Sequence, residues 1–310
     1  MPTSHRLLAA SVAVVWGVNF LAIDASLEHF PPMLLVALRF GLIAVPTVLL
    51  VPRPQVELRW LLGYGIGFGT LQFLFLYAGM YAGMPAGLAS LVLQSSAPFT
   101  VLLGATVFRD RISGRQVAGL LLATAGLATV GWAQAGTATL VPFLLVLAGG
   151  FGWAIGNVSN ARARAASPFR LVLWMSVVPP VPMLTISLMV EGPDRIAHAL
   201  TGWEEPQAVM ALLGLAYTVL AGTLLGSWLW SWLMARHPAG LVAPFSMLVP
   251  VVGMSAAWVV LGEGLAPLEL AGAGIVVAGV LLGSTRGPRS VPPTTDAVVL
   301  VEAKPGRTGR

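Results

Sequence analysis

Hydrophobic and polar positions alternate along this chain in long blocks rather than singly. Long apolar runs recur, separated by short stretches that hold charges, prolines and glycines. Because a helix needs roughly 20 mostly apolar residues to cross a bilayer, this pattern predicts an all-α polytopic membrane protein with ten spanning helices. The predicted spans are residues 7–27, 33–51, 60–82, 86–108, 115–134, 140–160, 169–190, 207–233, 239–262 and 267–284.

The composition agrees with a membrane-embedded chain. Hydrophobic residues make up 57% of it and charged residues 9%, with a mean hydropathy of +0.85, whereas a soluble domain has roughly 25% charged residues. The sequence contains no cysteine, which excludes disulfides and thiolate chemistry. The net charge of +5 is distributed along the chain in the way that membrane orientation requires and does not form a basic patch. We therefore expect a lipid bilayer and no nucleic acid as partner.

The basic residues predict how the chain sits in the membrane. When the chain is threaded with its amino terminus inside, all 17 lysines and arginines except Arg39 and Arg195 fall on one side. The positive-inside rule then predicts an even number of spans with both termini in the cytoplasm. Residues 285–310 are rich in proline, threonine and arginine, and they predict a disordered cytoplasmic tail.

An internal repeat relates the two halves of the chain. Pro-Ala-Gly-Leu at 85–88 returns 153 positions later at 238–241, and Gly-Thr-Leu at 69–71 returns at 222–224. Asp110 and Glu263 share this register but fall on opposite sides of the membrane, because five spans per repeat is an odd number that inverts the second copy.

We therefore predict two inverted five-helix repeats, residues 7–134 and 140–284, with a binding site where they meet near the middle of the membrane. The extra residues of the second half fall in a long acidic external loop at 191–206.

Polar side chains within the spans are the candidate ligand-binding groups. An amide offers a donor and an acceptor, which match a zwitterionic amino-acid head group without adding net charge. The alternative for each amide is a hydrogen bond between helices. Asn19 and Asn157 stand out because they occupy corresponding places in the first and sixth spans, beside Trp16 and Trp153. The amide and tryptophan candidates for substrate binding are Trp16, Asn19, Gln72, Gln94, Trp153 and Asn157.

Arg39 is the one basic residue within a predicted span, and it is the seventh candidate. Because a charge in hydrocarbon is costly, its guanidinium should face protein or water and find a partner. Two interpretations remain open: an ion pair with Asp24 or Glu28, and direct attraction of a substrate carboxylate.

Catalytic signatures are missing from the sequence. We find no phosphate-binding loop, no metal-ligand cluster and no acid–base pair within the membrane, so neither a cofactor nor an enzymatic activity is predicted. A membrane-embedded enzyme acting on lipid-linked substrates would show histidines or carboxylates clustered at one membrane face, and the sequence suggests none. A membrane sensor would need a signalling partner, and no soluble domain is evident.

Several segments carry a family resemblance. They are Val-Trp-Gly-Val-Asn-Phe at 15–20, Leu-Arg-Phe at 38–40, the run Gly-Met-Pro-Ala-Gly-Leu-Ala-Ser-Leu-Val-Leu-Gln at 83–94, and Trp-Ala-Ile-Gly-Asn at 153–157. With them the chain resembles the EamA family of the drug/metabolite transporter superfamily from about residue 12 to residue 283. The resemblance implies an inner-membrane exporter of small polar metabolites, amino acids such as cysteine or O-acetylserine, that works by alternating access.

Overall fold

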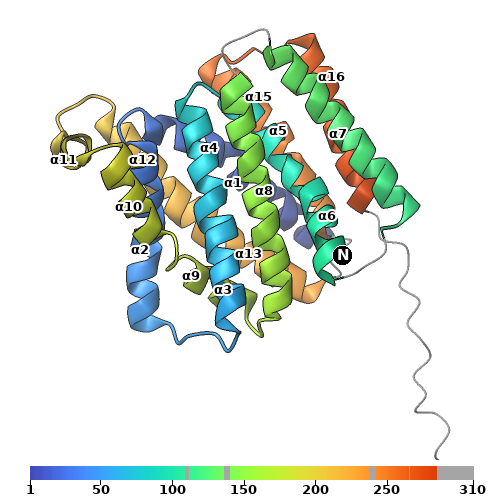
Figure 1. Cartoon of the computed structure of the whole chain (residues 1–310), viewed down its shortest axis with the longest axis horizontal. Coiled ribbons are helices and arrows are strands. Elements are labelled where there is room, and N and C mark those ends of the chain that lie inside the picture. The colour runs from blue at the N-terminus through green and yellow to red at the C-terminus, as the bar shows by residue number, and fades with distance from the viewer. Residues whose placement is uncertain (109–111, 136–139, 238–241, 265, 285–310) are drawn as a thin grey trace, which may run out of the picture.

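The computed structural model describes residues 1–108, 112–135, 140–237, 242–264 and 266–284, and every regular element in these ranges is a helix (Figure 1). The first half contains α1 (Thr3–Leu27), α2 (Pro32–Leu50), α3 (Leu58–Tyr64), η1 (Gly65–Leu71), α4 (Gln72–Tyr81), α5 (Ala86–Val92), η2 (Leu93–Ser95), α6 (Ser96–Phe108) and α7 (Gly114–Ala135). The second half contains α8 (Leu140–Ala163), α9 (Pro168–Met175), α10 (Pro180–Val190), α11 (Pro193–Thr201), α12 (Ala208–Tyr217), η3 (Thr218–Leu225), α13 (Gly226–Arg236), η4 (Ala243–Met247), α15 (Leu248–Leu261) and α16 (Pro267–Ser284).

The long apolar helices coincide with the predicted spans. Eight continuous helical segments in the described ranges are long and apolar enough to cross a membrane. Two shorter apolar helices, Phe245–Leu261 and Pro267–Gly283, occupy the predicted ninth and tenth spans. The all-α, multi-pass fold class is therefore confirmed, while the predicted helix start at 239, Asp110 and the tail 285–310 lie outside the described residues.

Several spans are not uniform α-helices. The third runs through a π-helical segment, η1, and the eighth runs through another, η3. The two segments begin at Gly65 and Thr218, which are equivalent positions in the repeat. The seventh span is broken between α9 and α10, where Pro179 and Pro180 remove backbone donors.

The connection at 191–206, expected as a loop, contains the helix α11. Gly192 adopts a φ of 83°, a conformation open to glycine, and so turns the chain into this helix. Ile196 and Ala199 are buried on one side of α11, while its other residues stay mostly exposed. The acidic segment thus contains a short amphipathic helix, which lies on the upper left of the molecule in Figure 1.

Glycines let α7 and α16 pack with their backbones in contact at the right of Figure 1. A Cβ atom on Gly126 would lie 2.7 Å from the backbone nitrogen of Val276, and one on Gly279 would lie 2.8 Å from Gly119 O. Small residues of this kind drive helix association in lipid, where apolar side chains gain little by leaving their surroundings.

Two carboxylates of the second half cap helices of the first half. Glu191 accepts hydrogen bonds from the backbone N–H groups of Met33 (2.7 Å) and Leu34 (3.1 Å) at the start of α2. Glu263 accepts from Ala86 (2.8 Å) and Gly87 (2.9 Å) at the start of α5. Each carboxylate satisfies donors that have no partner within their helix and lies at the positive end of the helix dipole.

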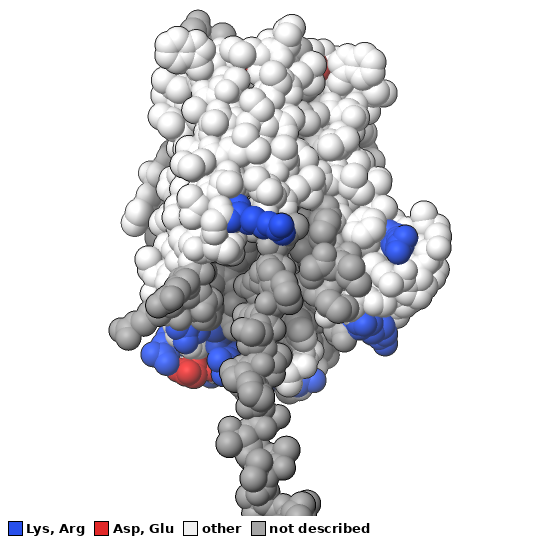
Figure 2. All heavy atoms as spheres, turned by 90° about the vertical axis from the view of Figure 1, so that its right-hand side faces the viewer, with Lys and Arg blue, Asp and Glu red and all other residues white. Residues whose placement is uncertain are grey.

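Charged side chains are unevenly distributed over the surface. Figure 2 shows the face at the right of Figure 1: its upper part exposes almost only uncharged side chains, and basic ones occur from mid-height downward. The lower end is the one where residues 51–57 join α2 to α3, and the upper end carries α11 (Figure 1). An uncharged band of this kind is what a protein embedded in a bilayer presents to lipid.

Candidate functional site

Trp16 and Asn19 place one face of α1 against η3. The indole Nε1 of Trp16 donates to the carbonyl oxygen of Gly222 at 2.9 Å. Asn19 is 7% exposed, and a Cβ on Gly222 would lie only 2.6 Å from its Oδ1 atom. The bare backbone of Gly222 is therefore what admits the asparagine side chain.

The π-helical segments share a side-chain interaction. Thr70 Oγ1 donates to Gly65 O at 3.2 Å in η1, and Thr223 Oγ1 donates to Thr218 O at 2.9 Å in η3. Each threonine thus binds the carbonyl five residues earlier, in the wider turn that a π-helix provides. Such turns occur frequently at functional sites.

Arg39 is 5% exposed and is held by neutral groups. Its Nε and Nη2 atoms donate to Thr223 Oγ1 at 3.2 and 2.9 Å, and Nη1 donates to Tyr77 OH at 2.8 Å. The guanidinium carbon lies 4.1 Å from the centre of the Phe73 ring. The ion pair considered with Asp24 or Glu28 is not formed, since hydroxyls and an aromatic face surround the charge instead. No carboxylate in the described ranges neutralises Arg39.

The other candidates gather around α8. Asn157 Nδ2 donates to Thr100 Oγ1 at 3.1 Å, and the rings of Trp153 and Phe68 lie 6.1 Å apart. A Cβ on Gly152 would lie 2.8 Å from the backbone nitrogen of Gln72, so α8 closely approaches the start of α4.

Gln94, in η2, meets Met247 through a long Nε2–Sδ contact of 3.8 Å. The seven candidates consequently form two groups, one on η3 (Trp16, Asn19 and Arg39) and one near α8 (Gln72, Gln94, Trp153 and Asn157).

Four buried polar atoms of this region have no hydrogen-bond partner: Asn19 Oδ1, Gln72 Oε1, Ser95 Oγ and Thr218 Oγ1. Leaving a buried polar group unpaired costs about 1–3 kcal/mol, so an ordered water or a ligand that hydrogen-bonds to any of these atoms would be stabilised. Thr218, like Tyr77 and Thr223, was not among the predicted residues. The Gly-Thr-Leu repeat was the signal that could have identified Thr223.

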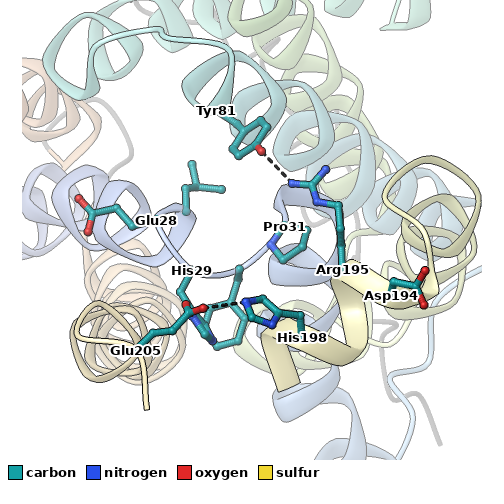
Figure 3. A pocket seen from close by; sticks show the side chains of 10 residues that line it. Glu28, His29, Pro31, Tyr81, Asp194, Arg195, His198 and Glu205 are labelled. Carbon is teal, nitrogen blue, oxygen red and sulfur yellow. Dashed lines mark hydrogen bonds and ion pairs between the residues drawn. The ribbon is translucent and has the colours of Figure 1, made fainter. Parts of the chain in front are cut away.

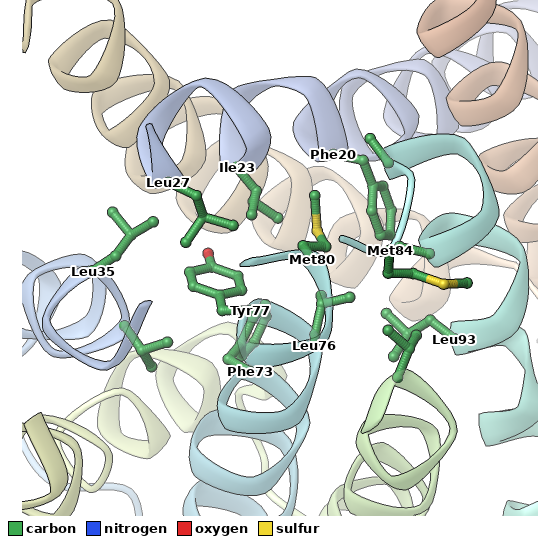
Figure 4. Close-up of a cluster of buried hydrophobic side chains, with 14 of the residues drawn as sticks. Phe20, Ile23, Leu27, Leu35, Phe73, Leu76, Tyr77, Met80, Met84 and Leu93 are labelled. Atoms are coloured by element: carbon green, nitrogen blue, oxygen red, sulfur yellow. The ribbon is translucent and has the colours of Figure 1, made fainter. Parts of the chain in front are cut away.

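An apolar layer separates the η3 group from the upper end of the molecule. Phe20, Ile23 and Leu27 of α1 face Leu76 and Met80 of α4 (Figure 4). All five side chains are at most 8% exposed. This layer closes the space between α1 and α4 at the upper end.

At the upper end itself, the structure corrects one expectation. His29 and His198 both contact Glu205, at 3.1 and 2.6 Å, so histidines and a carboxylate do cluster at one face. Sequence separation concealed this cluster, because α11 brings together residues from two halves. No group of three such residues in the described ranges could hold a metal ion.

Comparison with known proteins agrees with this architecture. The chain matches the EamA-like transporter family over residues 4–132 and 140–285, and it belongs to that family. It is 43% identical to a "Probable amino-acid metabolite efflux pump" of Salmonella typhimurium and 38% identical to a protein of the same description from Escherichia coli, each over 91% of this chain and 95% of the relative.

A solved crystal structure with 20% sequence identity shares the fold, with a TM-score of 0.60 over 91% of this chain and 98% of that one. The chain is therefore a multi-pass membrane protein, and its family and relatives point to a transporter rather than an enzyme.

Proposed function

We propose that this protein exports small polar metabolites across the inner membrane, with amino acids such as cysteine or O-acetylserine as its substrates. Two relatives that share over a third of its residues are described as probable amino-acid metabolite efflux pumps. In this proposal ten helices cross the membrane, both termini are cytoplasmic, and the upper end of the molecule faces outward.

The observation that supports amino acids as the substrate class is the presence of two unpaired polar groups beside η3. Arg39 binds Thr223, and Asn19 lies against the adjacent Gly222, so a guanidinium without a carboxylate and an amide oxygen without a donor flank one π-helical turn. A guanidinium suits a carboxylate, and an amide oxygen suits an ammonium. An α-amino acid carries both groups and would satisfy both sites.

Contacts between equivalent residues support the inverted repeat. Gln94 and Met247 are separated by 153 positions, the repeat offset, and they touch. Two residues exchanged by a two-fold axis can meet only close to that axis, so the axis of the proposed repeat would pass near this contact. The π-helical segments η1 and η3 and the short 3₁₀ segments η2 and η4 also recur in both halves.

Alternating access follows from this arrangement. The apolar layer between α1 and α4 would hold the outer side closed, and substrate would reach Asn19 and Arg39 from the cytoplasm. Rocking of one half against the other would then reverse the accessible side.

Counterflow in proteoliposomes tests the proposal. Purified protein is reconstituted with an unlabelled amino acid inside, and uptake of the labelled compound is measured for a panel that includes cysteine and O-acetylserine. We expect transient accumulation of at least one panel member above protein-free vesicles. Repeating the assay with different pH gradients distinguishes proton-coupled transport from exchange, and absence of counterflow for every compound would contradict the proposal.

A further inference from the structure

The helix α11 and the residues that follow it are attached to both edges of the apolar layer described above. His29 lies two residues after Leu27, the last residue of α1, and Tyr81 directly follows Met80 at the end of α4. Both residues contact the α11 segment around a pocket of about 390 Å³ at the upper end of the molecule (Figure 3). Because the layer closes the space between α1 and α4, these attachments hold its two sides together.

The two attachments differ in strength. At the α4 edge, Nη2 of Arg195 donates to Tyr81 OH at 2.8 Å, but both side chains are exposed, so water competes for this hydrogen bond (Figure 3). At the α1 edge, Nδ1 of His29 lies 3.1 Å from Glu205 Oε2, and the His29 side chain is completely enclosed. The His29 contact therefore provides most of the attachment.

Both ring nitrogens of His29 face hydrogen-bond acceptors. Nδ1 faces the Glu205 carboxylate, and Nε2 lies 2.9 Å from the carbonyl oxygen of Ala199. A neutral imidazole has one N–H group and one lone pair, whereas the protonated ring donates from both nitrogens. Because neither a carbonyl oxygen nor an ionised carboxylate can donate, both contacts are hydrogen bonds only when His29 is protonated.

The groups around His29 determine how this contact responds to pH. The charged or titratable side chains that line the pocket with it are Glu28, Tyr81, Asp194, Arg195, His198 and Glu205. Among them, Glu205 is the one that hydrogen-bonds to the His29 ring, and hydrogen bonds from His29 and, second, from His198 lower the pKa of the Glu205 carboxyl group. Glu205 therefore stays ionised over the range in which histidines titrate, about pH 5–8. Loss of the His29 proton in that range removes the donor from one of its two contacts.

We propose that His29, Glu205 and α11 form a pH-controlled latch on the outer side of the transporter. With His29 protonated, the latch holds the ends of α1 and α4 together and keeps the apolar layer closed. When His29 loses its proton, the latch weakens and the layer opens more often. This inference rests on the proposed function, in which the apolar layer closes the outer side. An acidic exterior would then keep that side closed, and an alkaline exterior would favour its opening.

The chain contains no cysteine, so single introduced cysteines can report opening of the layer. The Ile23→Cys variant, purified in nanodiscs without substrate, is labelled with a water-soluble maleimide. Ile23 is 1% exposed, so labelling requires the layer to open. Its rate is divided by that of Arg59→Cys, an exposed position at the lower end, which corrects for the pH dependence of the thiol reaction. We expect the corrected rate to rise at least about tenfold from about pH 5 to about pH 8, because one hydrogen bond to a charged group is lost.

Two histidine variants locate the switch. His29→Gln has no titratable ring, so in that background the corrected labelling rate should be equally high at both pH values. His198→Gln should keep the pH dependence, because the single contact of His198 with Glu205 can be donated by a neutral ring. A corrected rate that is independent of pH with His29 in place, or the same pH dependence in His29→Gln, would overturn the latch.

The labelling needs neither substrate nor transport, so the latch and the proposed function can fail separately. Absence of counterflow together with pH-dependent labelling would overturn the export proposal alone. Intact counterflow together with labelling that is independent of pH would overturn the latch alone. Met80→Cys, on the α4 side of the layer and 5% exposed, repeats the measurement if Ile23→Cys does not fold.

Discussion

The close contact between α7 and α16 predicts that alanine substitutions at two glycines of α16 change the stability of the protein in opposite directions. An alanine at Gly279 would bring its Cβ closest to the backbone nitrogen of Ala123, and within 2.8 Å of both Ala123 Cα and Gly119 O, whereas ordinary contact begins at 3.4 Å. Because all three neighbours are backbone atoms, they cannot rotate away, and the helices must separate by more than about 0.6 Å. Overpacking of this kind costs about 1–3 kcal/mol, and the better helix propensity of alanine offsets about 0.5–1 kcal/mol of it.

Gly274→Ala is the matched control, because a Cβ at Gly274 meets nothing within 4 Å. That variant keeps the propensity gain without the clash, so it should be up to about 1 kcal/mol more stable than the wild type. Gly279→Ala should be about 1–2 kcal/mol less stable. Unfolding of the purified proteins by SDS in mixed micelles, followed by circular dichroism, measures both values. Equal stability of the two variants would refute the backbone contact between α7 and α16.

Three further predictions concern side chains that join distant segments. Glu263→Ala should lower the free energy of unfolding by about 2 kcal/mol, because two N–H groups of α5 lose a charged acceptor; the exposed control Glu57→Ala should change it by less than about 0.5 kcal/mol in the same SDS titration. Thr223→Val leaves the buried Arg39 without its main acceptor and should cost about 2–3 kcal/mol, whereas Thr223→Ser keeps the hydroxyl and should stay near the wild type; equal losses would contradict the assigned bond. Hydrogen bonds from His29 and, second, from His198 lower the pKa of the Glu205 carboxyl group. The ionised carboxylate therefore stabilises the folded state fully at neutral pH, and this stabilisation is lost as the pH falls through that lowered pKa. The apparent melting temperature should therefore decline less on acidification in Glu205→Gln than in the wild type, and parallel pH curves would argue against this role.

The fold was largely predictable because lipid imposes a minimum length on apolar helices. That constraint appears directly in the hydropathy of segments such as α1 and α8, whose predicted and observed extents overlap almost fully. The π-helical turns η1 and η3 were not predicted, since a shift in backbone hydrogen bonding leaves no trace in hydropathy. The helix α11 was missed because only Ile196 and Ala199 of its nine residues are buried.

The candidate site was predictable in its residue types but not in its partners. Arg39 was recognised as unusual because a buried charge needs compensation, yet its acceptor Thr223 lies 184 positions away. Trp16 binds a carbonyl 206 positions away, which no local pattern reveals. The repeat suggested equivalent roles for Asn19 and Asn157, but Asn157 donates to Thr100 while the Oδ1 atom of Asn19 has no partner. Local side-chain packing differs between the two halves even where the sequence repeats.

The most direct test of the central claim is the initial rate of amino-acid counterflow by Asn19→Ala and Asn157→Ala, each compared with Asn160→Ala. Asn160 is an exposed asparagine on α8, so its replacement controls for loss of an amide from the same helix. We predict that Asn19→Ala loses most of the counterflow rate, Asn157→Ala loses part of it, and Asn160→Ala retains the wild-type rate. Undiminished counterflow in both Asn19→Ala and Asn157→Ala would contradict the binding site proposed for this transporter.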